Sequence, residues 1–157
     1  MLDYENALTG AVVYDMTNAG RIWMRDKDRA SLLHRLSTND IERLQVGQGT
    51  RTVLTNHNGR IIDVLTVHAL PDALLLITSP PQRATVMSLL KKNIFFNDKV
   101  KVADASDELH QLTLYGPTSA ALLAQLGAPD LTALPLHNIS AATIADVPVQ
   151  IAATLPL

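Results

Sequence analysis

The sequence of 157 residues contains no cysteine. Disulfide bonds, thiolate nucleophiles and thiolate-held zinc or iron–sulfur sites are therefore excluded within this chain. Aromatic residues are scarce, at 4%, and no apolar run is long enough to span a bilayer. The first ten residues, MLDYENALTG, have neither the basic region nor the apolar stretch of a signal peptide. These absences favour a soluble protein in the cytoplasm.

Charge and histidine spacing predict neither a nucleic-acid surface nor a metal site. The formal net charge is −2, and we take the basic residues to be spread along the chain, whereas a nucleic-acid surface needs a concentrated basic patch. The five histidines lack the short spacing typical of metal ligands, so we expect no metal in this chain. GQGT at 47–50 has only a G-x-G pattern, which indicates a loop before a strand rather than a phosphate cradle. No complete catalytic motif is present.

Apolar periodicity predicts short strands and helices in a single domain, the size that 157 residues favour. The clearest feature is a β-hairpin over 49–56 and 60–69, because Asn58-Gly59 is typical of a type I′ turn with positive φ at both central residues. The tail from Thr143 to Ala153 predicts one or two strands, broken around 146–148. Further strands are expected at 11–16, 21–25, 74–78, 99–103 and 109–115, and helices at 26–37, 81–94 and 117–127.

A weak internal repeat links the two ends of the sequence. At one constant offset, a strand–link–helix pattern recurs, in which Ile22, Met24, Leu32, Leu33 and Leu36 match Leu112, Leu114, Leu122, Leu123 and Leu126. The repeat predicts two related α+β halves, although leucine-rich helices also resemble one another by coincidence. The last stretch, ADVPVQIAATLPL, is apolar and strand-like. We therefore expect that the chain belongs to a longer protein or self-associates through this strand.

One carboxylate interrupts an apolar strand in TNHNGRIIDVLTV, residues 55–67. Strand alternation puts Asp63 on the apolar face, with Ile61, Leu65 and Val67. A carboxylate on such a face must be paired, hydrogen-bonded or functional, because burying it without a partner costs free energy. From the residues alone we favour an ion pair with Arg51 or Arg60, or a solvated edge position, over a working acid.

Several segments together resemble a known family. LLHRLSTNDIERL, the N-x-x-G-R-I-I-D pattern at 56–63 and LTLYGPTSAALLAQLG follow the order found in the folate-binding family of the glycine-cleavage aminomethyltransferase (T-protein) and the YgfZ-type proteins. The chain resembles the N-terminal portion of this family over almost its whole length. The resemblance implies an α+β fold of two intertwined ββαβββα-type halves with antiparallel sheets, without its C-terminal part. The halves would comprise residues 1–48 with 109–157, and residues 49–108.

The resemblance also implies a tetrahydrofolate in a cleft between the halves. Aminomethyltransferases carry two consecutive aspartates in this hairpin strand, and the second contacts the reactive region of the folate. Here Asp63 matches the first and Val64 stands at the second, so we expect no catalytic residue there. Arg51 would meet the anionic glutamyl tail of the folate or a carboxylate of its own protein. The other folate contacts that the alignment carries over are Ala19, Leu75, Ile77 and Ser79.

Three functions remain open. The first is a tetrahydrofolate-binding, YgfZ-like accessory protein for iron–sulfur enzymes, present here as an N-terminal fragment without enzymatic activity of its own. The second is an aminomethyltransferase of the glycine cleavage system, which moves a one-carbon unit from a lipoyl carrier protein to tetrahydrofolate. The third is a module with only a structural or dimerising role. Val64 favours the first over the second. The protein partner would be an iron–sulfur enzyme or a lipoyl carrier protein.

Overall fold

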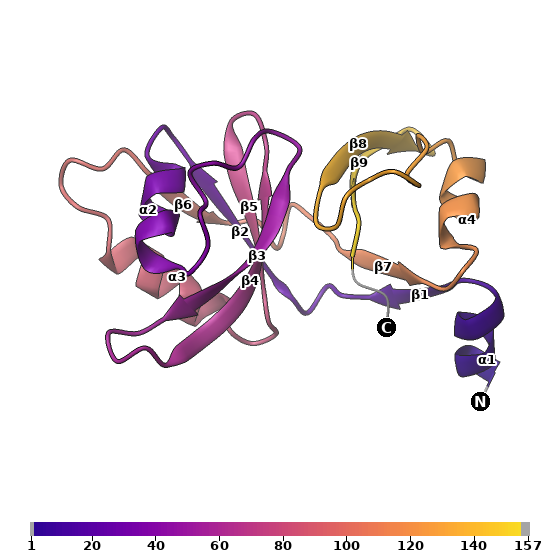
Figure 1. Cartoon of the computed structure of the whole chain (residues 1–157), viewed down its shortest axis with the longest axis horizontal. Helices are drawn as coiled ribbons and strands as arrows, with labels where there is room; N and C mark the ends of the chain where they lie inside the picture. Colours follow the sequence, from indigo (N-terminus) through magenta and orange to yellow (C-terminus); the bar gives the residue numbers. More distant parts are fainter. Residues whose placement is uncertain (1, 155–157) are drawn as a thin grey trace.

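The computed structural model describes residues 2–154, which form two lobes along the long axis of the molecule (Figure 1). Every strand and helix predicted from the sequence is present, with ends shifted by a few residues, whereas α1 was not predicted. No helix in this part of the chain has the length and apolar character needed to cross a membrane. The first lobe contains β2 (Gly20–Arg25), α2 (Arg29–Leu36), β3 (Gly49–Thr55), β4 (Ile61–Ala69), β5 (Ala73–Thr78), α3 (Arg83–Lys92) and β6 (Lys101–Asp104). The second lobe contains α1 (Leu2–Thr9), β1 (Val12–Asp15), β7 (Leu112–Tyr115), α4 (Ser119–Gln125), β8 (Ile139–Ile144) and β9 (Val147–Ala152).

Five antiparallel strands form the sheet of the first lobe, in the order β3-β4-β5-β2-β6. Strand β2 lies between β5 and β6, since Gly20 pairs with Thr78 and Ile22 pairs with Asp104. The sequence prediction grouped residues 49–108 and assigned β2 and α2 to the other half. In the structure these two elements lie with residues 49–104, because β2 is an inner strand of their sheet. The remaining strands form two antiparallel pairs, β1–β7 and β8–β9.

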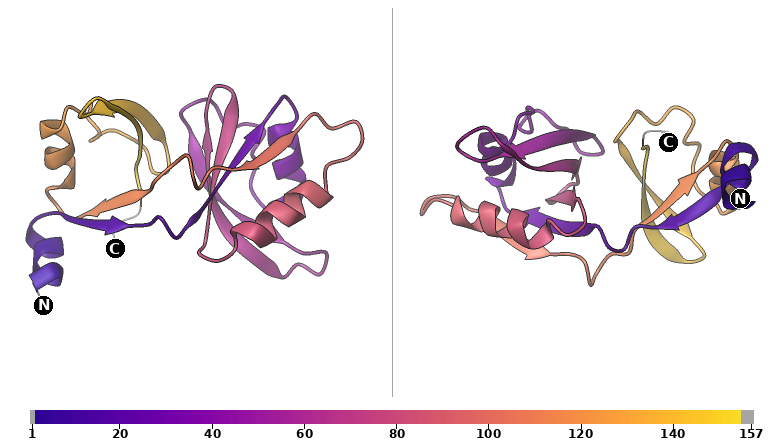
Figure 2. Two further views of the ribbon diagram at one scale, coloured as in Figure 1. Left: turned by 180° about the vertical axis from the view of Figure 1, so that it is seen from behind. Right: turned by 90° about the horizontal axis from the view of Figure 1, so that it is seen from below.

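Helices α2 and α3 cover one face of the five-stranded sheet, and the main apolar core lies between them (Figure 1 and Figure 2). Alternate residues of each strand point to this face, as a pleated strand requires, and burying each large side chain contributes about 1.5–3 kcal/mol. The opposite face, which we call the open face, turns toward β8 and β9 of the second lobe (Figure 1). The core consists of Ile22, Met24, Leu32, Leu33, Ile41, Leu54, Leu65, Val67, Ala69, Leu74, Leu76, Val86 and Leu90.

The internal repeat predicted from the sequence is confirmed by the order and spacing of the elements. Helices α2 and α4 begin at 29 and 119, and strands β3 and β8 begin at 49 and 139, so both pairs are 90 residues apart. A positive φ recurs at the same offset where a strand turns into a helix, at Asp26 (75°) and Gly116 (116°). The unit strand–helix–strand–strand is therefore used twice in this chain.

The β3–β4 hairpin forms as predicted, but the prediction of a type I′ turn at Asn58-Gly59 is wrong. Gly59 has a positive φ (74°), whereas Asn58 does not. The Gly59 N–H donates to the Asn56 carbonyl (2.9 Å), and the Asn56 side chain accepts the N–H groups of Asn58 (2.9 Å) and Arg60 (3.0 Å). The Asn56 carboxamide thus organises a four-residue turn, in which only Gly59 needs the left-handed conformation.

The β8–β9 hairpin carries the tighter turn instead. Ile144 pairs with Val147, and the two residues between them, Ala145 (φ 50°) and Asp146 (φ 64°), both have positive φ. This is the backbone of a type I′ turn, which asparagine and glycine normally occupy. Ala145 does not signal such a turn, which is why the sequence predicts only a break around 146–148.

Equivalent segments of the two halves meet where the lobes touch. The Ile139 N–H donates to the Gly47 carbonyl (2.9 Å), and the Gly49 N–H donates to the Asn138 side chain (3.3 Å). Residues 47–49 and 137–139 are related by the 90-residue offset, so the repeat packs against itself in a pseudo-twofold manner. A Cβ on Gly49 would overlap with the His137 carbonyl, so this close approach requires glycine.

Candidate functional site

The open face of the first lobe gathers four of the residues predicted from the sequence to bind folate. Directly opposed residues of antiparallel strands point to the same side of a sheet. Arg51 lies opposite Thr66, which lies opposite Ile77, and Val64 lies opposite Val53. The side chains on this face include Arg21, Trp23, Arg25, Arg51, Val53, Val64, Thr66, His68, Leu75 and Ile77.

The exposure of the side chains on this face increases from β5, which carries buried apolar residues, to β3, which carries an exposed arginine. Leu75 is 7% exposed, whereas Val64 and Ile77 are half-buried and present part of their apolar surface. Arg51, on the outer strand β3, is exposed. The face therefore offers an apolar surface with a cation at one side.

Asp63 lies on the other face of β4, and its carboxylate is bonded to the main chain. It is 4% exposed and points to the same side as Leu65, as strand alternation predicts. One carboxylate oxygen accepts the Ser79 N–H (3.0 Å), and the other accepts the Val64 N–H (2.8 Å). No ion pair of Asp63 occurs within residues 2–154, so the salt bridge to an arginine expected from the residues alone is absent. Asp63 thus fastens the end of β5 to β4.

The two remaining predicted residues, Ala19 and Ser79, come together beyond the ends of β2 and β5. They line a hollow of about 300 Å³. Ala19 is 3% exposed, whereas Ser79 is exposed. A Cβ on Gly20 would overlap with the side chains of Thr78 and Arg83, so glycine is required for this packing. The hollow is lined by Thr17, Asn18, Ala19, Gly20, Ser79, Pro81, Arg83 and Ala84.

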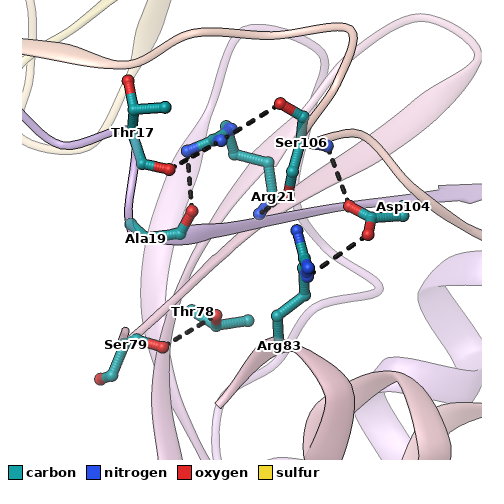
Figure 3. Close-up of polar contacts among 8 residues, drawn as sticks. All are labelled: Thr17, Ala19, Arg21, Thr78, Ser79, Arg83, Asp104 and Ser106. Carbon is teal, nitrogen blue, oxygen red and sulfur yellow. Dashed lines mark hydrogen bonds and ion pairs between the residues drawn. The ribbon is translucent and has the colours of Figure 1, made fainter. Parts of the chain in front are cut away.

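Arg21, which follows Gly20 of this hollow in β2, is a buried cation with 2% of its surface exposed. Its guanidinium donates to the carbonyls of Ala19 (2.7 Å), Thr17 (3.1 Å) and Ser106 (3.3 Å), as Figure 3 shows. Thr17 and Ala19 lie on the link from β1 to β2, and Ser106 lies on the link from β6 to β7. Arg21 therefore ties together the two segments that cross between the lobes.

A second arginine lies closer to solvent at the same place. Arg83 Nε is 3.3 Å from an oxygen of Asp104, and Asp104 also accepts the Ser106 N–H (2.9 Å; Figure 3). Burial opposes ionisation of Asp104, but the hydrogen bonds from Ser106 and the charges of Arg83 and Arg21 outweigh it, so the pKa of this carboxyl is lowered. Asp104 therefore stays ionised and holds Arg83 at the hollow.

Two histidines lie at the contact between the lobes. His68 is 5% exposed, and its Nδ1 is 2.9 Å from the His137 carbonyl. A carbonyl only accepts, so Nδ1 of His68 carries the hydrogen. Burial lowers the pKa of His68, and burial followed by the charge of Arg51 lowers the pKa of His137. Both rings are therefore neutral at neutral pH. Within residues 2–154, no group of three or more His, Cys, Asp or Glu is arranged to hold a metal.

Trp23, Arg21 and Arg83 lie among these residues although sequence reasoning did not select them. The half-buried Trp23 lies opposite Leu75, and its indole N–H donates to Glu108 (2.9 Å). The Arg25 guanidinium lies 4.8 Å from the centre of the Trp23 ring. Trp23 is the single tryptophan of the chain. Alternation from the predicted contact Ala19 into β2 is a signal that could have identified Arg21 and Trp23, but it was not used.

Comparison with known proteins places this geometry in a family. The sequence model of the GCVT N-terminal domain matches residues 3–154. A chloroplastic Arabidopsis thaliana protein, whose name assigns it to the transferases, is 36% identical over 126 residues, which are 80% of this chain and 29% of that protein. The aminomethyltransferase of Herpetosiphon aurantiacus is 28% identical over 136 residues, which are 86% of this chain and 37% of that protein. The chain thus spans about a third of the length of these relatives.

Two solved structures share the fold. Aminomethyltransferase T of the Bartonella henselae glycine cleavage system aligns with a TM-score of 0.78 and 22% identity, over 88% of this chain and 37% of that chain. The heterotetrameric sarcosine oxidase of Corynebacterium sp. U-96 aligns with a TM-score of 0.66 and 18% identity, over 98% of this chain and 77% of that chain. The first alignment confirms the predicted α+β fold with antiparallel sheets. Because the domain model covers nearly all of the described residues, this chain belongs to the GCVT N-terminal domain family, the aminomethyltransferase family that its sequence resembles.

Proposed function

We propose that this chain provides one wall of a tetrahydrofolate-binding site in a protein related to the aminomethyltransferases. The observation that carries the proposal is the clustering on the open face. Val64, Leu75 and Ile77 are folate contacts that the family resemblance implies, and they lie together on the face that turns toward the second lobe. Core residues would point to the opposite side, against α2 and α3.

The chemistry of this face fits a flat heteroaromatic ring with an anionic tail. Val64 and Ile77 offer apolar surface that a ring would cover, and the adjacent Trp23 offers an aromatic face for packing. Arg51 is exposed at the edge of the sheet, where its guanidinium is free to form a bidentate contact with a glutamyl carboxylate. Tetrahydrofolate would carry the one-carbon unit. The residues of this wall would orient its rings and exclude water from them.

Binding rather than proton transfer is the role that we assign to this wall. A general acid or base must lie within hydrogen-bonding reach of the reacting nitrogen. Val64 has no donor or acceptor in its side chain. The Asp63 carboxylate points to the core side of β4 and already accepts two main-chain N–H groups. Neither residue therefore serves as the acid of a transfer reaction in this arrangement.

Aminomethyl transfer is the second candidate, and the relatives favour it, because several of them are named aminomethyltransferases. If the reaction takes place on this face, its acid or base is neither Asp63 nor Val64. A YgfZ-like accessory role for iron–sulfur enzymes, the first of the three functions that the sequence left open, is supported by Val64 alone. Self-association through the terminal strand is supported by the position of β9, whose ladder partner within residues 2–154 is β8 alone.

Calorimetric titration with 5-formyltetrahydrofolate tests the folate proposal. We expect saturable binding accompanied by a change in the fluorescence of Trp23. Ile77→Ser should weaken binding about tenfold, which corresponds to ~1.4 kcal/mol. The matched control is Ile61→Ser, because Ile61 is 68% exposed on the same sheet but lies at the start of β4, outside the open-face cluster. Absence of binding heat, or equal weakening by both serine variants, would refute the proposal.

Val64→Asp tests the second candidate. This variant puts a carboxylate on the open face at the position where aminomethyltransferases carry one. Formation of methylenetetrahydrofolate from an aminomethyl donor by the variant, but not by the natural chain, would show that Val64 limits the chemistry. Equal transfer by the natural chain would contradict our assignment of a binding role.

A further inference from the structure

Charge is divided very unevenly between the two lobes. All 13 Lys and Arg residues lie between Arg21 and Lys101, so the interpretation that they are spread along the chain is wrong. Residues 20–104, which make up the first lobe, combine these 13 with eight of the 15 Asp and Glu, a net charge of +5. The rest of the chain has no Lys or Arg and carries the other seven acidic residues, a net charge of −7. Five of them belong to residues 1–19 and 112–157, which contain the second lobe, and Asp107 and Glu108 lie on the link from β6 to β7. The overall value of −2 therefore hides a strongly dipolar molecule.

The positive end carries a segment of unusual composition. Residues 91–101, KKNIFFNDKVK, contain four of the five lysines and both phenylalanines of the chain, and we call this segment the basic-aromatic loop. It joins α3 to β6 and projects at the end of the first lobe far from the second lobe (Figure 1). Phe96 is fully exposed and Phe95 is 59% exposed. Exposed aromatic rings are typical of protein contact surfaces. The lysines beside them give this surface a positive charge.

The loop is held in a defined shape. Asp98 accepts the Phe95 N–H (2.9 Å) and forms an ion pair with Arg35 (2.6 Å), and the Arg35 guanidinium lies 5.1 Å from the centre of the Phe95 ring. Lys101 pairs with Asp26 (3.3 Å). Lys91, Lys92 and Lys99 are exposed, and none of them takes part in an ion pair within the described residues. Three cations and two rings therefore face solvent from a structured turn.

The second lobe has the complementary surface. Asp130 and Asp146 are exposed, Asp146 at the tip of the β8–β9 hairpin, and neither forms an ion pair within residues 2–154. Exposed apolar side chains lie on the same lobe: Val147 (57%) follows Asp146, and Leu136 is 45% exposed. Helix α4 has no buried residue, although its counterpart α2 buries two leucines. This lobe therefore combines negative charge with incompletely covered apolar surface.

We propose that two copies of this chain associate in antiparallel orientation, each placing its basic-aromatic loop against the acidic second lobe of the other. The two lobes lie at opposite ends of the long axis, so an antiparallel pair forms both contacts at once (Figure 1). Such a pair is closed and isologous, the commonest symmetry of soluble oligomers. A polyanion such as nucleic acid or an acidic membrane matches the loop but is repelled by the seven acidic residues elsewhere, so the second copy is the better partner.

Sedimentation velocity of the 157-residue chain tests this proposal. We expect a reversible dimer at about 0.05 M NaCl that weakens on the order of tenfold or more at about 1 M, where the screening length falls to about 3 Å. Phe95→Ser with Phe96→Ser should leave a monomer at both salt concentrations. The matched controls are Val46→Ser and Arg60→Glu, which change an exposed apolar and an exposed basic residue of the first lobe outside the loop. Both controls should dimerise normally.

A charge exchange makes the test specific. The variant Lys91→Glu/Lys92→Glu and the variant Asp130→Lys/Asp146→Lys should each be monomeric, because each places like charges in both contacts of its own pair. Mixed together they should form a heterodimer, because opposite charges then meet at both contacts. Folding of each variant is checked by circular dichroism, and folate binding provides a separate readout, so failure of this proposal is distinguishable from failure of the proposed function.

Three results would overturn the proposal. The first is a monomer at every salt concentration. The second is a dimer that resists high salt and the loop substitutions, which would point to the edge of β9 instead. The third is a monomer whose loop binds single-stranded oligothymidine or phosphatidylserine vesicles and loses that binding in the Phe95→Ser/Phe96→Ser variant.

Discussion

Asp63 and Val64 are neighbours in β4, yet their side chains lie on opposite faces of the sheet. The Asp63 carboxylate joins β4 to the residue that follows β5, whereas Val64 faces the second lobe with Arg51 and Ile77. Side chains of consecutive residues in a strand point to opposite faces of the sheet. An acid at 63 therefore cannot replace an acid at 64, although the two positions are adjacent in sequence.

Removing the Asp63 carboxylate should destabilise the fold. In Asp63→Ala the N–H groups of Ser79 and Val64 lose their acceptor at a buried site, which costs about 2 kcal/mol of the free energy of unfolding. Asp63→Asn keeps one acceptor oxygen, so its free energy of unfolding should decrease less than that of Asp63→Ala. Urea unfolding measures both, with Asp72→Ala as the exposed control. Weakened folate binding at unchanged stability would instead assign Asp63 to the site.

Replacing Arg21 should destabilise the two segments that link the lobes. Arg21→Met keeps most of the side-chain volume but leaves the carbonyls of Thr17, Ala19 and Ser106 without their donor, so we expect a loss of at least about 3 kcal/mol. The stability of Arg21→Lys should lie between those of the natural chain and Arg21→Met, because an ammonium group reaches fewer of these oxygens than a guanidinium group. Thermal unfolding measures the loss, and Arg60→Met at the exposed hairpin is the matched control. Equal stability of the two methionine variants would show that Arg21 is dispensable.

Stability should decrease as the pH falls below about 6.5, because His68 has a lowered pKa in the folded chain. Between the folded and the unfolded pKa, the unfolded chain binds a proton that the folded chain does not. The contribution of neutral His68 is therefore complete above about pH 6.5 and is lost on acidification, by at most about 1.4 kcal/mol per pH unit.

His68→Gln tests this pH dependence. The glutamine amide is able to donate to the His137 carbonyl but does not titrate. Between about pH 7.5 and about pH 5.5 the variant should show a flatter stability profile than the natural chain. His57→Gln at the exposed β3–β4 turn should leave the profile unchanged. Parallel profiles for the natural chain and His68→Gln would contradict the prediction.

Patterns that repeat within the sequence predicted the fold well. Alternation in β4 and the leucines of α2 and α4 fixed the strands, the helices and the two related units, because each pattern reflects burial of one face. The grouping of the strands was harder. β2 joins β5 and β6 across gaps of more than forty residues, and no local signal specifies that pairing.

Features that depend on distant main-chain groups could not be predicted. The partners of Asp63 are N–H groups, which every residue except proline carries, so the sequence gives no reason to choose Ser79 over an arginine. The same holds for Arg21, whose acceptor Ser106 lies 85 residues away. The open-face positions were found by resemblance to a family and by strand alternation, whereas the uneven charge of the two lobes became meaningful only once the lobes were known.

Substitutions in the turn of the β8–β9 hairpin should stabilise the fold. Ala145 and Asp146 both occupy positive φ, a conformation that costs an alanine about 1 kcal/mol or more. Ala145→Asn with Asp146→Gly supplies the residues that type I′ turns prefer and should raise the free energy of unfolding by about 1 kcal/mol. Asn58→Gly is the informative control: a type I′ turn at Asn58-Gly59 would gain from it, but Asn58 does not have positive φ. We therefore expect that control to be neutral or to lose a few tenths of a kcal/mol, because glycine adds freedom to the unfolded chain. Stabilisation by Asn58→Gly, or none by the double change at 145–146, would show that the two turns have been assigned the wrong way round.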